Sequence, residues 1–133
     1  MANPTIEAIK SETLSEINYL EDEYEIIKNF LKGVVIDLLQ VRTTLQSFKD
    51  RLSKVRLLTA AYFLMTQKQN FNLQTKPVLD SIDMALVLME INPQLNMQGA
   101  RGILQLCLTM SDVKIEDVMS LVSMVKRTAF IEK

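Results

Sequence analysis

An uninterrupted heptad pattern of apolar residues runs through the first half of the chain. These residues, which we name the heptad seam, recur at alternating steps of three and four: Ile17, Leu20, Tyr24, Ile27, Leu31, Val34, Leu38, Val41, Leu45, Phe48, Leu52 and Val55. A period of 3.5 residues places one apolar stripe along a helix and favours packing against another helix, as in a coiled coil. The pattern therefore predicts a long amphipathic helix whose seam is covered by protein.

The bounds of this first helix follow from its flanking residues. Asn3 can cap a helix N-terminus and Pro4 fits the first turn, so we expect the helix to begin there. No further proline occurs until Pro77, and good helix formers predominate before it, which predicts one helix over about residues 4–68. The alternative is a bend or hairpin tip at Gly33. We expect the helix to continue through Gly33, because its immediate flanks offer neither a capping side chain nor a polar loop.

The second half of the chain is expected to form about three shorter helices. The polar run at 67–76 predicts a loop, and apolar residues then recur at helical spacing at about 77–91, 94–110 and 113–130. The chain contains only three Gly and three Pro, which favours few long elements over many strands. The sequence thus predicts one all-α domain over 1–133, in which a coiled-coil-like N-terminal helix packs with the shorter helices in a bundle.

Two glycines and six methionines distinguish the second half. Gly99 and Gly102 lie in the predicted helix at 94–110, where they permit close approach of another helix. Methionine at helical spacing fills gaps in a bundle core, which is the favoured interpretation, or lines a groove that adapts to a partner helix. The six residues concerned are Met84, Met89, Met97, Met110, Met119 and Met124.

Charge is distributed unevenly along the chain. Residues 1–25 contain seven acids and one Lys, whereas residues 26–76 contain nine bases and two acids. Bases that flank the seam form what we name the basic ridge: Arg42, Lys49, Arg51, Lys54 and Arg56. The favoured interpretation is that the ridge pairs with the acidic segment of an antiparallel neighbour, with Lys49, Arg51 and Arg56 approached by Glu16, Glu21 and Glu23. The alternative is a track that binds nucleic-acid phosphates.

Several kinds of catalytic and metal chemistry lack the residues that they need. The chain contains no His, so Ser–His and Cys–His nucleophilic machinery cannot form, and one Cys is too few for structural zinc. The spacings of the three Gly match neither a phosphate-binding loop nor a dinucleotide-binding fingerprint. We therefore expect no enzyme activity, no metal and no cofactor. Carboxylate-dependent hydrolysis is kept as a weaker alternative.

The sequence also bears on location. The longest nearly apolar stretch, at 57–65, is shorter than the roughly 20 residues that a transmembrane helix needs. The N-terminal residues lack the basic and apolar regions of an ordinary secretory signal. The single cysteine, Cys107, cannot form a disulfide within the chain. We therefore expect a cytoplasmic protein with no membrane partner.

The seam leads to the functional hypothesis. A helix of roughly 50 residues is about 75 Å long, and the rest of the chain is too short to cover it. We therefore expect a non-catalytic interaction protein, an assembly subunit or adaptor whose seam binds itself or another helical protein in a homo-oligomer or larger complex. A monomeric bundle shows much the same apolar pattern. The second hypothesis is a helical subunit of a nucleoprotein complex that contacts phosphates through the basic ridge.

Overall fold

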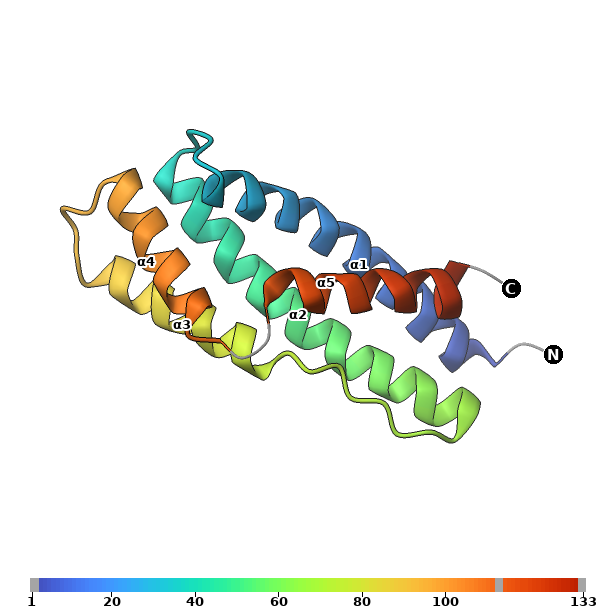
Figure 1. The fold of residues 1–133 in the computed structure, drawn as a ribbon. Helices are drawn as coiled ribbons and strands as arrows, with labels where there is room; N and C mark the ends of the chain where they lie inside the picture. The colour runs from blue at the N-terminus through green and yellow to red at the C-terminus, as the bar shows by residue number, and fades with distance from the viewer. Residues whose placement is uncertain (1–2, 112–113, 132–133) are drawn as a thin grey trace.

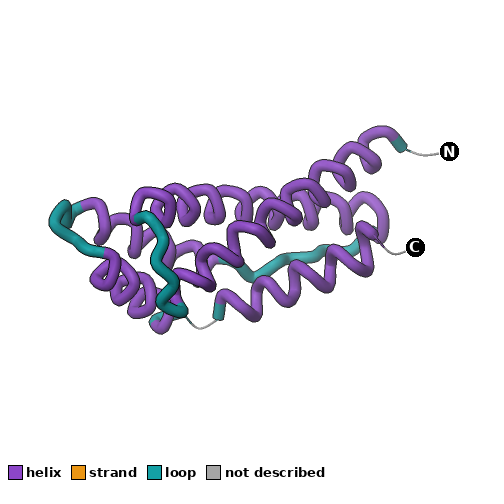
Figure 2. Tube along the Cα trace, turned by 90° about the horizontal axis from the view of Figure 1, so that it is seen from above, coloured by secondary structure: helices purple, strands orange, loops and turns teal. Residues whose placement is uncertain are grey.

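The computed structural model describes residues 3–111 and 114–131, and these form an all-α bundle (Figure 1). Helix and loop are the states that the described residues adopt (Figure 2). The elements in chain order are α1 (Pro4–Leu31), α2 (Leu38–Gln67), α3 (Lys76–Glu90), α4 (Met97–Thr109), α5 (Ile115–Val125) and a π-helical segment (Lys126–Ile131). No helix in the described part of the chain has both the length and the apolarity to cross a membrane.

The predicted continuous helix over about 4–68 is wrong, because the chain reverses direction after Leu31 and α1 and α2 form an antiparallel hairpin (Figure 1). Gly33 has φ +102°, a left-handed conformation that side chains with a Cβ rarely adopt. Its N–H donates to the Phe30 carbonyl at 3.1 Å, and the Val34 N–H donates to the Asn29 carbonyl at 3.0 Å. This pair of hydrogen bonds is the Schellman motif, which satisfies the last carbonyl groups of a helix and ends it.

The sequence signal for the turn is completed by a helix cap four residues after Gly33. Asp37 is the N-cap of α2, and its carboxylate accepts a hydrogen bond from the Gln40 N–H at 3.2 Å. The prediction failed because it sought a cap and a polar loop directly beside Gly33, whereas the turn is built from apolar residues at 34–36 with the cap beyond them. Gly33 and Asp37 together were the signal that could have located the hairpin.

The heptad seam closes within this hairpin. Eight of its twelve residues have exposed fractions of at most 1% and belong to the core, namely Ile17, Leu20, Ile27, Val41, Leu45, Phe48, Leu52 and Val55. Three more, Tyr24, Leu31 and Leu38, are half-buried against that core, while Val34 is exposed in the turn. The apolar stripe of α1 therefore meets the apolar stripe of α2, and the burial of each large side chain contributes about 1.5–3 kcal/mol.

The shorter helices cover the hairpin in two groups (Figure 1). The α3–α4 hairpin lies near the end where α1 turns into α2, and α5 lies toward the end that carries both termini. Between α2 and α3, residues 68–75 run back along α2 as an extended segment whose Leu73 and Thr75 side chains are buried (Figure 2). Helix α4 also ties down the end of α1, because Arg101 Nε donates to the Phe30 carbonyl at 2.6 Å. Buried residues from all five α-helices and Phe130 form one core cluster.

The predictions for the second half of the chain are confirmed in outline. The loop expected at 67–76 is observed at 68–75, and the helices expected at about 77–91 and 94–110 are α3 and α4. The helix expected at 113–130 corresponds to α5 and the π-helical segment, although its predicted first residue lies outside the described part. The π-helical segment itself was not predicted.

Candidate functional site

The seam was the predicted partner-binding site, and the structure places it inside the chain. Its α2 residues Leu45, Phe48 and Leu52 are fully buried by the chain's own helices. A second molecule cannot reach them while the hairpin is closed. The surface available to a partner must therefore be sought elsewhere on the bundle.

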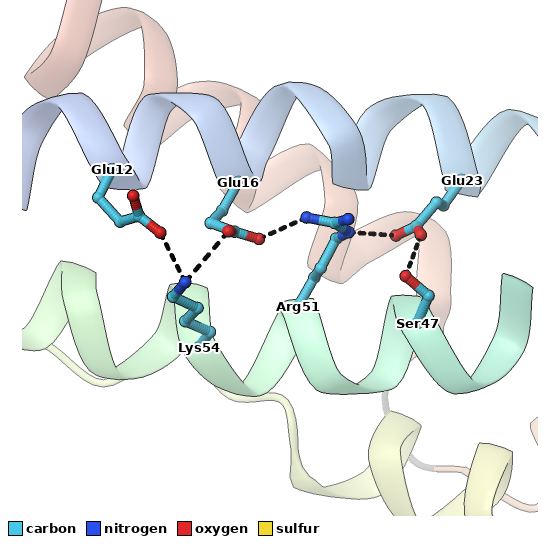
Figure 3. A network of polar contacts seen from close by, with 6 residues as sticks. All are labelled: Glu12, Glu16, Glu23, Ser47, Arg51 and Lys54. Atoms are coloured by element: carbon cyan, nitrogen blue, oxygen red, sulfur yellow. Dashed lines mark hydrogen bonds and ion pairs between the residues drawn. The ribbon is translucent and has the colours of Figure 1, made fainter.

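Two residues of the basic ridge, Arg51 and Lys54, pair with acids of the same chain (Figure 3). Arg51 on α2 pairs with Glu16 of α1 at 2.7 Å, and its Nε lies 3.3 Å from a Glu23 oxygen. Lys54 lies 2.6 Å from Glu12 and 3.2 Å from Glu16. The expectation that an antiparallel acidic helix meets the ridge is confirmed for Arg51, and the neighbour is α1 of the same chain.

Burial and ion pairing act on the same groups in opposite directions. Burial penalises the charged form of Glu16, but hydrogen bonds and charge from Lys54 and Arg51 outweigh it and lower the pKa of Glu16. Burial likewise disfavours the charged form of Arg51, but Glu16 and Glu23 raise its pKa. The network therefore keeps these side chains charged and holds α1 against α2, because removing one partner would leave a half-buried charge.

The other predicted ridge contacts are distributed differently. Lys49 pairs at 2.6 Å with Asp83 of α3, so it joins α2 to α3 instead of α1. Glu21 pairs at 2.7 Å with Lys126, which ties the C-terminal segment to α1. Arg42 and Arg56 have no ion pair among the described residues. They are four helical turns apart on α2, so the ridge does not present a continuous row of uncompensated charge.

A different surface emerges from the exposed residues of α3. Met84, Val87 and the C-cap residue Ile91 are spaced by three and four residues, so they lie on one side of the helix. Their exposed fractions are 49%, 56% and 70%. The opposite face of α3 is buried in the core through residues such as Ile82 and Ala85. Helix α3 therefore has a second apolar stripe that nothing in the described chain covers.

Helix α4 carries a matching stripe beside it. Gly102, Leu106 and Met110 recur every four residues and are exposed, Leu106 by 61% and Met110 by 67%. One residue of each stripe, Met84 and the α4 C-cap residue Met110, lines a hollow of about 470 Å³ with Cys107. We name the two stripes together the α3–α4 face: Met84, Val87, Ile91, Gly102, Leu106 and Met110.

The methionines of the second half divide between the two interpretations made from the sequence. Met89 and Met119 are core residues, as the favoured interpretation predicts. Met84 and Met110 line the hollow between α3 and α4, as the groove interpretation predicts. The sequence pattern could not separate these two groups, because both occupy apolar positions at helical spacing.

The α4 side of the α3–α4 face is poor in charge. Arg101 is the single charged residue of α4, and its side chain is directed to the end of α1, where it bonds the Phe30 carbonyl. Of the three acids of α3, Asp80 pairs with Lys76 and Asp83 with Lys49, whereas Glu90 is exposed and has no ion pair among the described residues. Depletion of charge together with exposed Leu and Met is typical of the centre of a protein interface. Other exposed apolar residues include Leu57 and Leu64 on α2 and Leu121 and Met124 on α5, whereas the α3–α4 face combines such residues from two adjacent helices.

Cys107 forms the inner wall of the hollow. The thiol is free and buried, and burial raises its pKa, so it is held in the unreactive protonated form. Within the described ranges, no three His, Cys, Asp or Glu side chains gather closely enough to hold a metal ion. The hollow therefore presents apolar contact from Met84 and Met110 beside the exposed Lys76–Asp80 ion pair.

Comparisons with protein-family models, with curated proteins and with solved structures each found no match to this chain.

Proposed function

We propose that this chain is a non-catalytic helical interaction protein, an assembly subunit or adaptor, that docks protein on its α3–α4 face. The observation that carries the proposal is the paired stripe of exposed apolar residues on two adjacent helices. Water disfavours such a surface, and its burial by a partner contributes roughly 25 cal/mol per Å². The chain's lack of His and its protonated, buried Cys107 support a non-catalytic role in a reducing cytoplasm.

The nucleoprotein hypothesis receives less support from the geometry. Lys49, Arg51 and Lys54 are bound to carboxylates of the same chain, so their exchange onto phosphates would break existing ion pairs. Arg42 and Arg56 alone would release few counterions on binding and would give weak affinity.

A cross-linking experiment tests the proposal. A photoreactive amino acid replaces Leu106 on the face or, as the matched control, Leu64, which is a leucine of similar exposure on α2. After irradiation of the purified protein and of the source cell extract, we expect a discrete protein adduct from position 106 and none from position 64. Val87→Glu, which places a charge on the face, should abolish the adduct. Absence of any adduct from position 106, or equal adducts from both positions, would refute the proposal.

A further inference from the structure

Gly102 is not explained by the packing of the chain that contains it. It lies in the interior of α4, where glycine destabilises a helix relative to alanine. A Cβ built on Gly102 would meet nothing within 4 Å, whereas one on Gly99 would come within 2.7 Å of the Leu95 side chain. Nothing in the described chain therefore requires Gly102 to be small. A requirement for close approach by another backbone would explain it.

The residues around Gly102 favour one kind of binding partner. Leu106 and Met110 extend its stripe, and its outward neighbours on α4 are the uncharged Gln98, Gln105 and Thr109. Two copies of such a surface can meet without bringing like charges together or burying an unpaired charge. A strongly charged amphipathic helix, in contrast, would find no complementary charges on α4. The uncharged apolar stripe on α4 of one copy is therefore compatible with the same stripe on a second copy.

We propose that a second copy of this chain docks on the α3–α4 face, with the two α4 helices antiparallel and crossing at Gly102. This inference rests on the proposed function, because it names the partner of the same surface. A two-fold axis brings each residue near the axis against its own counterpart, and Gly102 lies close to the middle of α4. The absence of a side chain there lets the two backbones approach, while Leu106 of each copy packs beside the crossing.

The size of the contact indicates a transient dimer. The crossing is centred on α4, which has 13 residues and is about 20 Å long, so we expect a contact smaller than the ~800 Å² per partner of a stable complex. We therefore expect a reversible dimer with a dissociation constant in the micromolar range. Analytical ultracentrifugation from about 1 to 500 µM covers that range. Leu106→Glu should remain monomeric throughout and stay folded, because Leu106 is 61% exposed.

Gly102→Ala gives the decisive result, because its two effects have opposite signs. Alanine favours the helix, so the melting temperature of the dilute monomer should rise by roughly 2–5 °C. The added methyl group should separate the crossing helices and weaken dimerisation at least about tenfold. Ser15→Ala on the exposed side of α1 is the control, and it should raise the melting temperature without changing the dissociation constant.

The outcomes separate this inference from the proposed function. The proposal that the partner is a second copy is refuted if the wild-type chain stays monomeric at all concentrations. It is also refuted if the Gly102→Ala chain dimerises as strongly as wild type. In the cross-linking experiment, an adduct of twice the chain mass from position 106 supports it. An adduct with a different protein alone would refute the second copy as the partner but would still support the α3–α4 face as a docking surface. No adduct at all overturns both.

Discussion

Leu45→Ala measures how strongly the seam holds the hairpin. Leu45 is a fully buried core residue of α2, so its truncation removes three carbons from the core. Loss of their transfer free energy amounts to about 2 kcal/mol, and the cavity left between two long helices brings the expected loss of unfolding free energy to about 3–4 kcal/mol. Leu39→Ala is the matched control on the same helix. Because Leu39 is 69% exposed, we expect a change within about 0.5 kcal/mol.

Urea unfolding followed by circular dichroism provides the free energies. Both substitutions are made in the Leu106→Glu chain, so that association through the α3–α4 face does not contribute. Because the seam closes within one chain, the urea concentration at the unfolding midpoint should be the same at protein concentrations of about 1 µM and about 50 µM. A midpoint that rises with concentration, or a loss below about 1 kcal/mol for Leu45→Ala, would refute an intramolecular seam.

Three further variants test other parts of the structure. The pKa of Glu16 lies below its ordinary value of 4.5, so its contribution to stability is present above that pH and is lost as the pH falls through the folded pKa. Glu16→Gln should therefore flatten the decline of the melting temperature below about pH 5, and an unchanged slope would contradict this. Gly33→Ala should lower the unfolding free energy by about 1–2 kcal/mol in urea, since its φ is +102°; no loss would contradict the turn geometry. A chain carrying Arg42→Ala and Arg56→Ala should bind nucleic acid as weakly as wild type at low salt, by fluorescence anisotropy; strong wild-type binding that these changes abolish would favour the nucleoprotein hypothesis instead.

Local chemistry made the helices predictable. The predicted cap Asn3 accepts backbone hydrogen bonds at the start of α1, and apolar spacing identified most of the faces that became buried. The hairpin was missed because a heptad stripe looks the same whether its partner helix belongs to another molecule or to the same one. Only the conformation of Gly33 and the cap at Asp37 distinguish the two cases, and an apolar turn between them concealed both signals.

The candidate site could not be located from the sequence for a related reason. Met84 and Met89 occupy apolar positions on one helix, yet the first is 49% exposed and the second 3%. Which of two apolar stripes a helix buries depends on how its neighbours pack, and periodicity alone does not carry that information. The basic ridge shows the same limit, because its charge pattern was recognised while the partner of Lys49 on α3 depended on the folded arrangement.

The central claim is that α1 and α2 lie antiparallel, so that the seam closes within the chain and leaves the α3–α4 face for a partner. Pulsed electron paramagnetic resonance between spin labels at Ser15→Cys and Leu57→Cys, in a Cys107→Ser chain, tests it most directly. Glu12 and Lys54 are joined at 2.6 Å, so these neighbouring sites should give a label separation below about 30 Å. A separation near 63 Å, about 1.5 Å for each intervening residue of an unbroken helix, would contradict the hairpin.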